Sequence, residues 1–278
     1  MQGKMGAWKS RYLDITTAKV CPVNCYPYCP QPKFRDAYGD ATNLLSFDDF
    51  ALALSHVPKD VGIAFSGFCE PFMNPRAPEM IRLAKAQGHE VRIYTTLVGL
   101  RLQDVAELKG CDEYLVLHLP DNKGISHIPT TEGWRATLAE VLTTLRVDHF
   151  MNMGDGFVSN DRGGNSYDAK PRRVKGPFHC DLLQLPQPVM LPNLDVAACW
   201  MDFALRHRVG NLKEQTYDEI VSGEPFRTIV SHRWRLNGTE LCRSCKMATP
   251  MYKWIPQSAM ASIVSISKRT RQRNYEGV

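Results

Sequence analysis

The sequence has no long hydrophobic run. Nowhere in its 278 residues do about 18 apolar residues follow one another, as a membrane-spanning helix requires. The N-terminus also lacks the apolar segment of a secretory signal peptide, so we expect a cytoplasmic protein with no membrane partner. Internal repeats and low-complexity tracts are absent. Hydrophobic residues make up 44% and charged residues 23%, which excludes a disordered chain, a collagen and a coiled coil.

The sequence also lacks a strong excess of charge. Its 34 Lys and Arg residues exceed its 29 Asp and Glu residues by five, which gives a formal net charge of +5. This balance permits an anionic partner but does not require one.

Cysteine, by contrast, is abundant, with nine residues. Because the cytosol keeps thiols reduced, metal binding or catalysis is favoured over a disulfide framework. Cys69 and Cys111 stand apart from the others, and we expect Cys69 to be a small buried residue rather than a ligand. The remaining seven form two groups, namely Cys21, Cys25 and Cys29, and then Cys180, Cys199, Cys242 and Cys245.

Strand-like and helix-like segments alternate along the first two thirds of the chain. Such alternation indicates βαβ units and a parallel sheet, and five or six units close part of a barrel. In such folds the chemistry lies on loops at the carboxyl ends of the strands. We predict strands at 11–16, 61–66, 90–96, 113–119 and 147–151, and helices at 46–55, 76–87, 103–109 and 131–145.

The chain divides into three predicted regions. Residues 1–176 would form the α/β partial (β/α)6 TIM-like barrel, and the polar, glycine-rich stretch 154–176 would end it as a long loop. Residues 177–255 hold few regular elements but four cysteines, so a metal centre is expected to stabilise them. Residues 256–278 are predicted to form an amphipathic helix, over 257–273, with a basic tip.

The first cysteine group is predicted to lie in a loop. Its thiols are spaced four residues apart, but Pro22 and Pro27 disfavour the helix on which they would share a face. Three thiolates can hold a cubane iron–sulfur cluster and leave one iron open. Equally, they can be three of four zinc ligands, with a histidine as the fourth. The spacing alone leaves both alternatives open.

Two signatures resemble the radical S-adenosylmethionine (radical SAM) superfamily. Tyr28 is the aromatic residue that precedes the family's third cysteine, although the second gap here holds three residues instead of two. Residues 66–71 read Ser-Gly-Phe-Cys-Glu-Pro and are followed by Asn74 and Pro75, which resembles the family's Gly-Gly-Glu-Pro stretch without its second glycine.

This resemblance implies a cofactor site. The amino and carboxylate groups of S-adenosylmethionine (AdoMet) would chelate the open iron, and the Glu70 carboxylate would satisfy the ammonium. Strand-end residues would bind the ribose and carboxylate. The cofactor-binding residues implied are Tyr28, Ser66, Gly67, Phe68, Glu70, Thr95, Thr96 and His118.

The second cysteine group suits zinc or an iron–sulfur cluster by its spacing. Its surroundings resemble the SPASM/twitch extension of radical SAM enzymes. Cys199 is followed by Asp202, then by the Gly-Asn pair at 210–211, a short helix and a Cys-x-x-Cys at 242–245, and 161–165 resembles the Arg-x-Gly-Asn stretch that precedes the extension. Four cysteines fit the shorter twitch form, with one auxiliary [4Fe–4S] cluster, so the chain would carry two. Zinc remains the alternative.

The resemblance implies reductive cleavage of AdoMet to a 5′-deoxyadenosyl radical that takes a hydrogen atom from substrate. A closed auxiliary cluster favours oxidation of the substrate radical, as in dehydrogenases of sugar-like alcohols. Arg162 and His118 are the predicted catalytic residues, with His149 and Asp155 as further polar candidates. The implied partners are a small-molecule substrate and an electron donor such as flavodoxin or ferredoxin.

Three other functions compete with this prediction. Many SPASM enzymes modify peptides, but only about ten residues precede the first predicted strand, so no peptide-binding module is expected there. Basic stretches at 170–175 and 268–273 could contact nucleic-acid phosphates, although a solvated helix end is the favoured explanation. A zinc or iron–sulfur protein with a purely structural role would not need Glu70 and its Ser-Gly and Pro neighbours.

Overall fold

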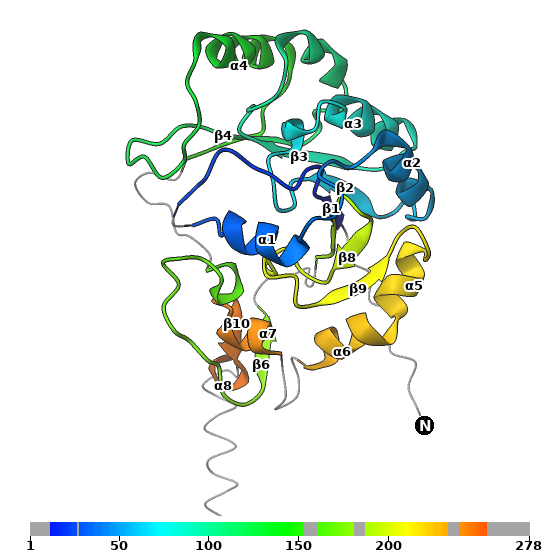
Figure 1. Cartoon of the computed structure of the whole chain (residues 1–278), viewed down its shortest axis with the longest axis vertical. Coiled ribbons are helices and arrows are strands. Elements are labelled where there is room, and N and C mark those ends of the chain that lie inside the picture. The colour runs from blue at the N-terminus through cyan, green and yellow to red at the C-terminus, as the bar shows by residue number, and fades with distance from the viewer. Residues whose placement is uncertain (1–11, 27, 153–160, 181–186, 233–238, 255–278) are drawn as a thin grey trace, which may run out of the picture.

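The computed structural model contains an eight-stranded sheet, with helices packed against it (Figure 1). It describes residues 12–26, 28–152, 161–180, 187–232 and 239–254. Its order is β5-β4-β3-β2-β1-β7-β8-β9, and the six strands from β5 to β7 run parallel. The edge strands β5 and β9 are not paired with each other, so the sheet is open, and the predicted α/β partial barrel is confirmed. The strands are β1 (Tyr12–Ile15), β2 (Gly62–Phe65), β3 (Val91–Thr95), β4 (Leu115–His118), β5 (His149–Met151), β7 (Val189–Met190), β8 (Asp195–Ala197) and β9 (Arg208–Asn211).

Local capping explains why the helices between these strands begin where they do. Ser46 accepts a hydrogen bond from the Asp49 N–H and starts one helix, and Thr131 does the same for the Trp134 N–H. The predicted helices at 46–55, 76–87 and 131–145 are confirmed to within a residue or so. They correspond to α2 (Phe47–Ser55), α3 (Ala77–Ala86) and α4 (Glu132–Thr144).

Two helix assignments from the sequence were wrong. Residues 103–109 form two short 3-10 turns, η2 (Leu102–Asp104) and η3 (Ala106–Leu108), because so short a segment gains too little from helix formation alone. No helix was predicted for α1 (Gln31–Tyr38), which follows the first cysteine loop. Its two neighbouring prolines suggested a break, but a proline in the first helical turn loses no hydrogen bond.

The sixth parallel strand does not arise from a sixth βα unit. Within the described residues no α-helix lies between β5 and β7, and β7 instead pairs with β1, on the side opposite β2. The antiparallel strands β8 and β9 then extend the sheet. The main core lies between this sheet and its helices, where Ile63, Phe65 and Met80 are fully buried.

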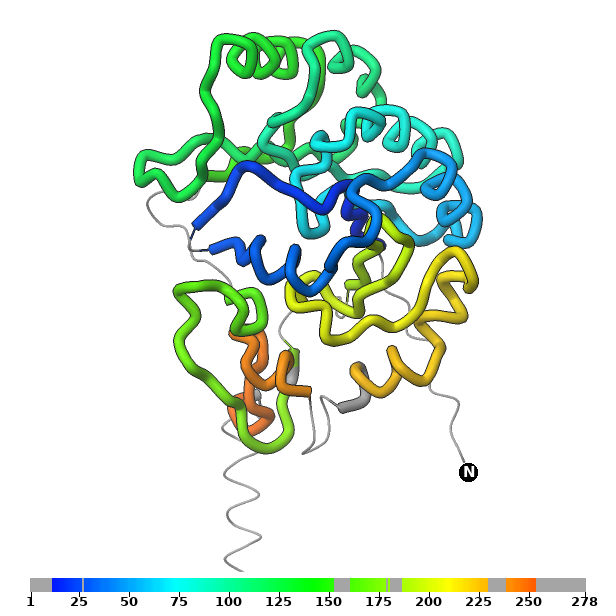
Figure 2. The backbone as a smooth tube through the Cα atoms, in the orientation of Figure 1, coloured from blue at the N-terminus to red at the C-terminus, as the bar shows by residue number. Residues whose placement is uncertain are grey.

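A second, two-stranded sheet lies beside the first. Its strands β6 (Phe178–Cys180) and β10 (Ala248–Pro250) are antiparallel, and the loop before β6 runs beside the chain of α7 and β10 (Figure 2). The division at 176 stays a prediction, since β7 belongs to the predicted second region but pairs with β1. The predicted helix at 257–273 lies outside the described residues. The remaining helices are α5 (Tyr217–Ser222), α6 (Glu224–His232), α7 (Glu240–Ser244) and α8 (Met251–Trp254).

Candidate active site

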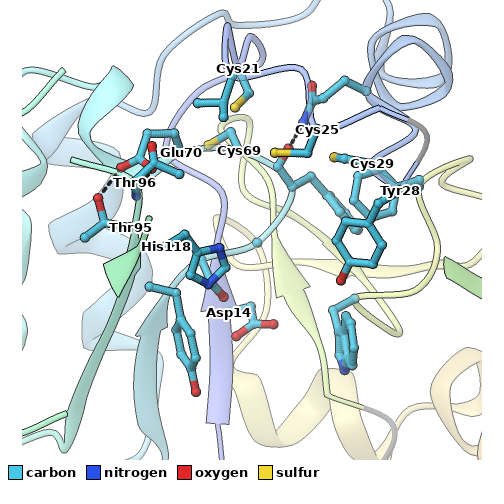
Figure 3. Close-up of a pocket in the computed structure, with 18 of the residues that line it drawn as sticks. Asp14, Cys21, Cys25, Tyr28, Cys29, Cys69, Glu70, Thr95, Thr96 and His118 are labelled. Carbon is cyan, nitrogen blue, oxygen red and sulfur yellow. Dashed lines mark hydrogen bonds between the residues drawn. The ribbon is translucent and has the colours of Figure 1, made fainter. Parts of the chain in front are cut away.

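A cavity of about 550 Å³ lies at the carboxyl ends of the parallel strands (Figure 3). It is bordered by the ends of β2, β3 and β4 and by the first cysteine loop. His149 does not line it, and Asp155 lies outside the described residues. It brings together twelve residues that were predicted from the sequence, namely Cys21, Cys25, Tyr28, Cys29, Ser66, Gly67, Phe68, Glu70, Thr95, Thr96, His118 and Arg162.

The first three cysteines lie in a series of turns, as predicted, and all three thiols are free. The Cys29 N–H donates to the Cys25 carbonyl at 2.7 Å. Burial raises the pKa of Cys25 to about 12, and the pKa values of Cys21 and Cys29 are raised for the same reason. The thiols are therefore neutral until a metal centre deprotonates them.

The donor set suits a cubane cluster. Three soft thiols face one cavity from a single loop, and in a cubane each thiolate binds a different iron. Among the residues the structure describes, no three His, Cys, Asp or Glu side chains are arranged to hold a single metal ion.

Arg162 lies between this loop and the segment that follows β8. Its guanidinium carbon lies 4.3 Å from the centre of the Tyr28 ring, 5.1 Å from that of Trp200 and 5.3 Å from that of Phe203. Such stacking fixes the cation in a site with little water. Neither aromatic residue after β8 was singled out from the sequence, because nothing in the residues around Cys199 indicates that these rings contact the first cysteine loop.

His118 is neutral in this cavity. Burial, with a smaller effect of the nearby Arg162 charge, lowers the pKa of His118 to about 4. Its Nε2 atom is buried and has no hydrogen-bond partner among the described residues. A neutral imidazole of such low basicity suits hydrogen bonding to a ligand, and a catalytic role for His118 stays a prediction.

Glu70 is surrounded by four hydrogen-bond donors. Its Oε1 accepts from the Thr95 hydroxyl at 2.6 Å and from the Phe72 N–H at 3.3 Å. Its Oε2 accepts from the Thr96 N–H and hydroxyl, both at 2.7 Å. Burial raises the pKa of Glu70, and these donors oppose the shift. Thr95 and Thr96 therefore hold Glu70 in place, and their predicted contacts with a cofactor stay predictions.

Replacing Glu70 with glutamine is expected to lower the free energy of unfolding by about 1–3 kcal/mol. One carboxylate oxygen becomes an NH2 group that meets donors on Thr95 or Thr96. The matched control is Glu79→Gln, at an exposed site paired with Arg76, which is expected to cost less than about 1 kcal/mol. Urea unfolding of both variants measures the difference, and equal losses would contradict this account of Glu70.

Gly67 allows the loop after β2 to lie against β1. Its φ is +57°, and a Cβ atom there would lie 2.9 Å from both the backbone nitrogen and the Cα of Thr16. Gly39 has a similar φ of +71° but open space around it. We expect Gly67→Ala to destabilise the protein by about 1–3 kcal/mol more than Gly39→Ala, because only the first also overpacks. Thermal unfolding of the two variants tests this, and similar losses would mean that the loop can shift.

Asp14 lines the cavity and was missed by the sequence analysis. It lies in β1, is 4% exposed, and accepts a hydrogen bond from Gln187 Nε2 at 2.7 Å. Burial raises the pKa of Asp14 to about 7, against the opposing effects of Ser66, Gln187 and Arg162. An acid in an otherwise apolar strand was the available signal, because an ionisable side chain is rarely buried without a role.

The structure brings the second group of cysteines together. Cys180 ends β6, Cys199 follows β8, and Cys242 and Cys245 lie in and after α7. Burial raises the pKa of Cys199 well above its usual value, and the charges of the other three cysteines raise it further. Four cysteine side chains that lie near one another could together ligate an iron–sulfur cluster.

The segment 161–165 connects the two cysteine sites. Asp161 accepts hydrogen bonds from the Gly163 N–H at 3.1 Å and the Lys246 N–H at 2.9 Å, and its charge acts on Cys245. Arg162, the next residue, faces the first cysteine loop. One short turn therefore contacts both sites.

The basic stretch at 170–175 is partly used within the fold. Arg172 donates to the Lys246 carbonyl at 2.8 Å, and Arg173 pairs with Glu240. The second basic stretch, at 268–273, lies outside the described residues. In the part of the chain that the structure describes, every helix is too short or too polar to traverse a bilayer.

Comparisons with known proteins agree with this arrangement. Residues 187–246 match the family model of SPASM, an iron–sulfur cluster-binding domain, and the range includes Cys199, Cys242 and Cys245. The fold is similar to that of BtrN in complex with AdoMet and 2-DOIA, with a TM-score of 0.61 at 16% identity, over 86% of this chain and 93% of that one. No curated protein matches the sequence.

Two further solved structures share the fold. Native anSMEcpe with bound AdoMet has a TM-score of 0.52 at 10% identity, over 93% of this chain and 99% of that one. Streptococcus suis SuiB bound to precursor peptide SuiA has a TM-score of 0.54 at 11% identity, over 86% and 70%. The chain thus shares the fold of these three structures, two of which contain AdoMet. More particularly, its residues 187–246 match an iron–sulfur cluster-binding SPASM domain.

Proposed function

We propose that the protein is an AdoMet-dependent radical enzyme that oxidises a small, hydroxyl-bearing molecule. A [4Fe–4S] cluster held by Cys21, Cys25 and Cys29 would supply reductive cleavage of AdoMet, and the resulting deoxyadenosyl radical would remove a hydrogen atom from substrate. The observation that carries the proposal is one cavity with three thiols along one side and a buried acid, Asp14, below His118 (Figure 3).

The size of the cavity supports small ligands. At about 550 Å³ it lies within the range of roughly 300–1,000 Å³ that small-molecule sites occupy. BtrN, which shares the fold, was crystallised with AdoMet and the small molecule 2-DOIA. The structures of anSMEcpe and SuiB with peptides keep peptide modification as the second candidate.

The residues of this chain have separate tasks in the proposed reaction. Arg162, stacked on three aromatic rings, keeps water out and places a positive charge beside the substrate. His118 orients the ligand by hydrogen bonding, and Glu70, whose oxygens are already hydrogen-bonded, acts on the AdoMet ammonium through its charge. Asp14 accepts the proton that the substrate hydroxyl loses on oxidation, since its pKa of about 7 suits proton transfer near neutral pH.

The second cysteine site is proposed to accept the electron that oxidation releases. Four thiolates leave no iron open for substrate, so an auxiliary cluster there would serve electron transfer. The turn at 161–165 contacts both sites, which supports coupling between them. An external donor such as reduced flavodoxin or ferredoxin would supply the first site.

The proposal is tested with protein purified without oxygen. Roughly eight irons per chain are expected if both sites hold cubanes. With dithionite and AdoMet the protein should form 5′-deoxyadenosine, and reduced flavodoxin or ferredoxin should replace dithionite. Iron-loaded protein that forms no 5′-deoxyadenosine would overturn the proposal.

The substrate class is tested in the same assay. A panel of polyols and amino-polyols deuterated at their carbinol carbons is compared with short peptides deuterated at Cα. Transfer of deuterium into 5′-deoxyadenosine from the alcohols, together with a carbonyl product, is expected. Transfer from the peptides alone would favour the second candidate.

A further inference from the structure

A fourth thiol lies in the cavity with the first cysteine group. Cys69 lines the same cavity, and its charge is among those acting on the Cys21 thiol. Figure 3 shows Cys69 between Glu70 and Cys25, below Cys21. The sequence analysis expected a small buried residue here, but the side chain faces the space that the cluster would occupy.

The sulfur of Cys69 is already held as a hydrogen-bond acceptor. The Ala18 N–H donates to Cys69 Sγ at 3.3 Å, and Thr17 Oγ1 lies 3.6 Å from the same sulfur. The Thr17 hydroxyl also donates to the Pro71 carbonyl at 2.7 Å. Backbone N–H groups directed at sulfur are the contacts that stabilise thiolates bound to iron–sulfur clusters.

The backbone around Cys69 is fixed relative to the cysteine loop. The Phe68 N–H donates to Thr16 Oγ1 at 3.1 Å, and Asn74 Nδ2 donates to the Thr17 carbonyl at 3.1 Å. Residues 16–18 lead directly to Cys21. The thiol is thus anchored to the segment that carries the first ligand, and it lines the same cavity as the three cysteines of the loop.

We propose that Cys69 is a fourth, exchangeable ligand, which closes the open iron of the first cluster when AdoMet is not bound. The inference rests on the proposed cluster at Cys21, Cys25 and Cys29. Binding forms one iron–sulfur bond and releases the thiol proton to solvent, with no change in the number of electrons on the cluster. The amino and carboxylate groups of AdoMet then displace the thiolate, which takes up a proton.

The test uses the full chain, reconstituted without AdoMet and then mildly oxidised with ferricyanide. A cubane with only three cysteine ligands readily loses its fourth iron, and the three-iron product is visible by electron paramagnetic resonance. We expect wild type to keep its iron, and Cys69→Ala to lose about one iron per chain with a several-fold stronger three-iron signal. Cys69→Ser, which nearly keeps the volume of the side chain, should behave like Cys69→Ala.

Cys111→Ala is the matched control, because Cys111 is a free thiol buried in the main core. It should behave like wild type. AdoMet added before oxidation should protect wild type and Cys69→Ala alike. A three-iron signal as strong in wild type as in Cys69→Ala would overturn the inference.

The same samples separate this inference from the proposed function. If replacing Cys69 causes loss of iron but the protein forms no 5′-deoxyadenosine, Cys69 is supported as a cluster ligand and the proposed function is refuted. Formation of 5′-deoxyadenosine with equal iron loss in all variants would support the function and refute the ligand.

Discussion

Replacing Cys25 with alanine is expected to abolish formation of 5′-deoxyadenosine, whereas replacing Cys242 is expected to leave it largely intact. Cys25 is the middle of the three thiols that face the cavity, and two thiolates from that loop do not hold a cubane. Iron should fall from roughly eight to roughly four atoms per chain in Cys25→Ala, because the first cluster is lost. Cys242→Ala leaves three thiols at the second site and should lose at least the one iron that Cys242 would bind. Anaerobic iron analysis and chromatography of 5′-deoxyadenosine measure the two effects.

The two variants are most informative as a pair, because together they separate cleavage of AdoMet from oxidation of the substrate. Cys242→Ala should still cleave AdoMet but should form little oxidised product, because a second cluster that lacks one of its four ligands is a poorer acceptor for the electron that the substrate releases. The control is again Cys111→Ala, which should keep both activities. If Cys242→Ala formed oxidised product at the rate of wild type, the second site would have a structural role only.

The sequence was sufficient to predict the parallel sheet and to divide seven cysteines into the two groups that the structure places together. Apolar strands that alternate with capped helices specify βαβ units locally, as Ser46 and Thr131 show. Cysteines are rare enough that their grouping carries information by itself. No local rule places Cys180 beside Cys199, because eighteen residues separate them in the sequence.

What the sequence could not predict depends on contacts between distant segments. Asp14 looks like an ordinary strand residue until Ser66, Gln187 and Arg162 are placed around it. The ring partners of Arg162 come from a loop almost forty residues later in the chain. The pairing of β7 with β1 has the same origin, because a two-residue strand carries no periodic signal of its own.

The role of Asp14 leads to the second large expected effect, in an Asp14→Asn variant. The groups that face Asp14 are Ser66, Gln187, Tyr94 and Arg162, and burial has the largest effect on its pKa. Because the folded pKa of about 7 lies above the ordinary value of 3.8, the folded protein holds a proton that the unfolded chain releases. The free energy of unfolding of wild type should therefore fall as the pH rises from about 4 to about 7.

Asparagine removes this dependence, so Asp14→Asn should gain stability relative to wild type as the pH rises, by up to about 4 kcal/mol for three pKa units. Urea unfolding of cluster-loaded protein across this pH range measures the gain. Asp121 supplies a control of opposite sign. Burial raises the pKa of Asp121, but N–H donors from Ser126, Ile125 and Lys123 outweigh that effect and lower the pKa overall. Asp121→Asn should therefore lose stability relative to wild type above about pH 4.

Activity distinguishes a proton acceptor from a merely buried acid. In wild type, oxidation of the substrate alcohol should increase with pH through about 7, because the acceptor must be ionised. In Asp14→Asn the oxidation should fall by about 10²–10⁴-fold, the usual contribution of a positioned base, while cleavage of AdoMet continues.

An Asp14→Asn variant that oxidises its substrate at the wild-type rate would show that Asp14 takes no part in the reaction. A stability difference that does not change with pH would show that the acid is not held near neutrality. Both results are needed, because the proposed role has two requirements. Asp14 must titrate near pH 7, and it must also contact the substrate in order to accept the hydroxyl proton. The radical would form separately, at the cluster that the thiols across the cavity would hold.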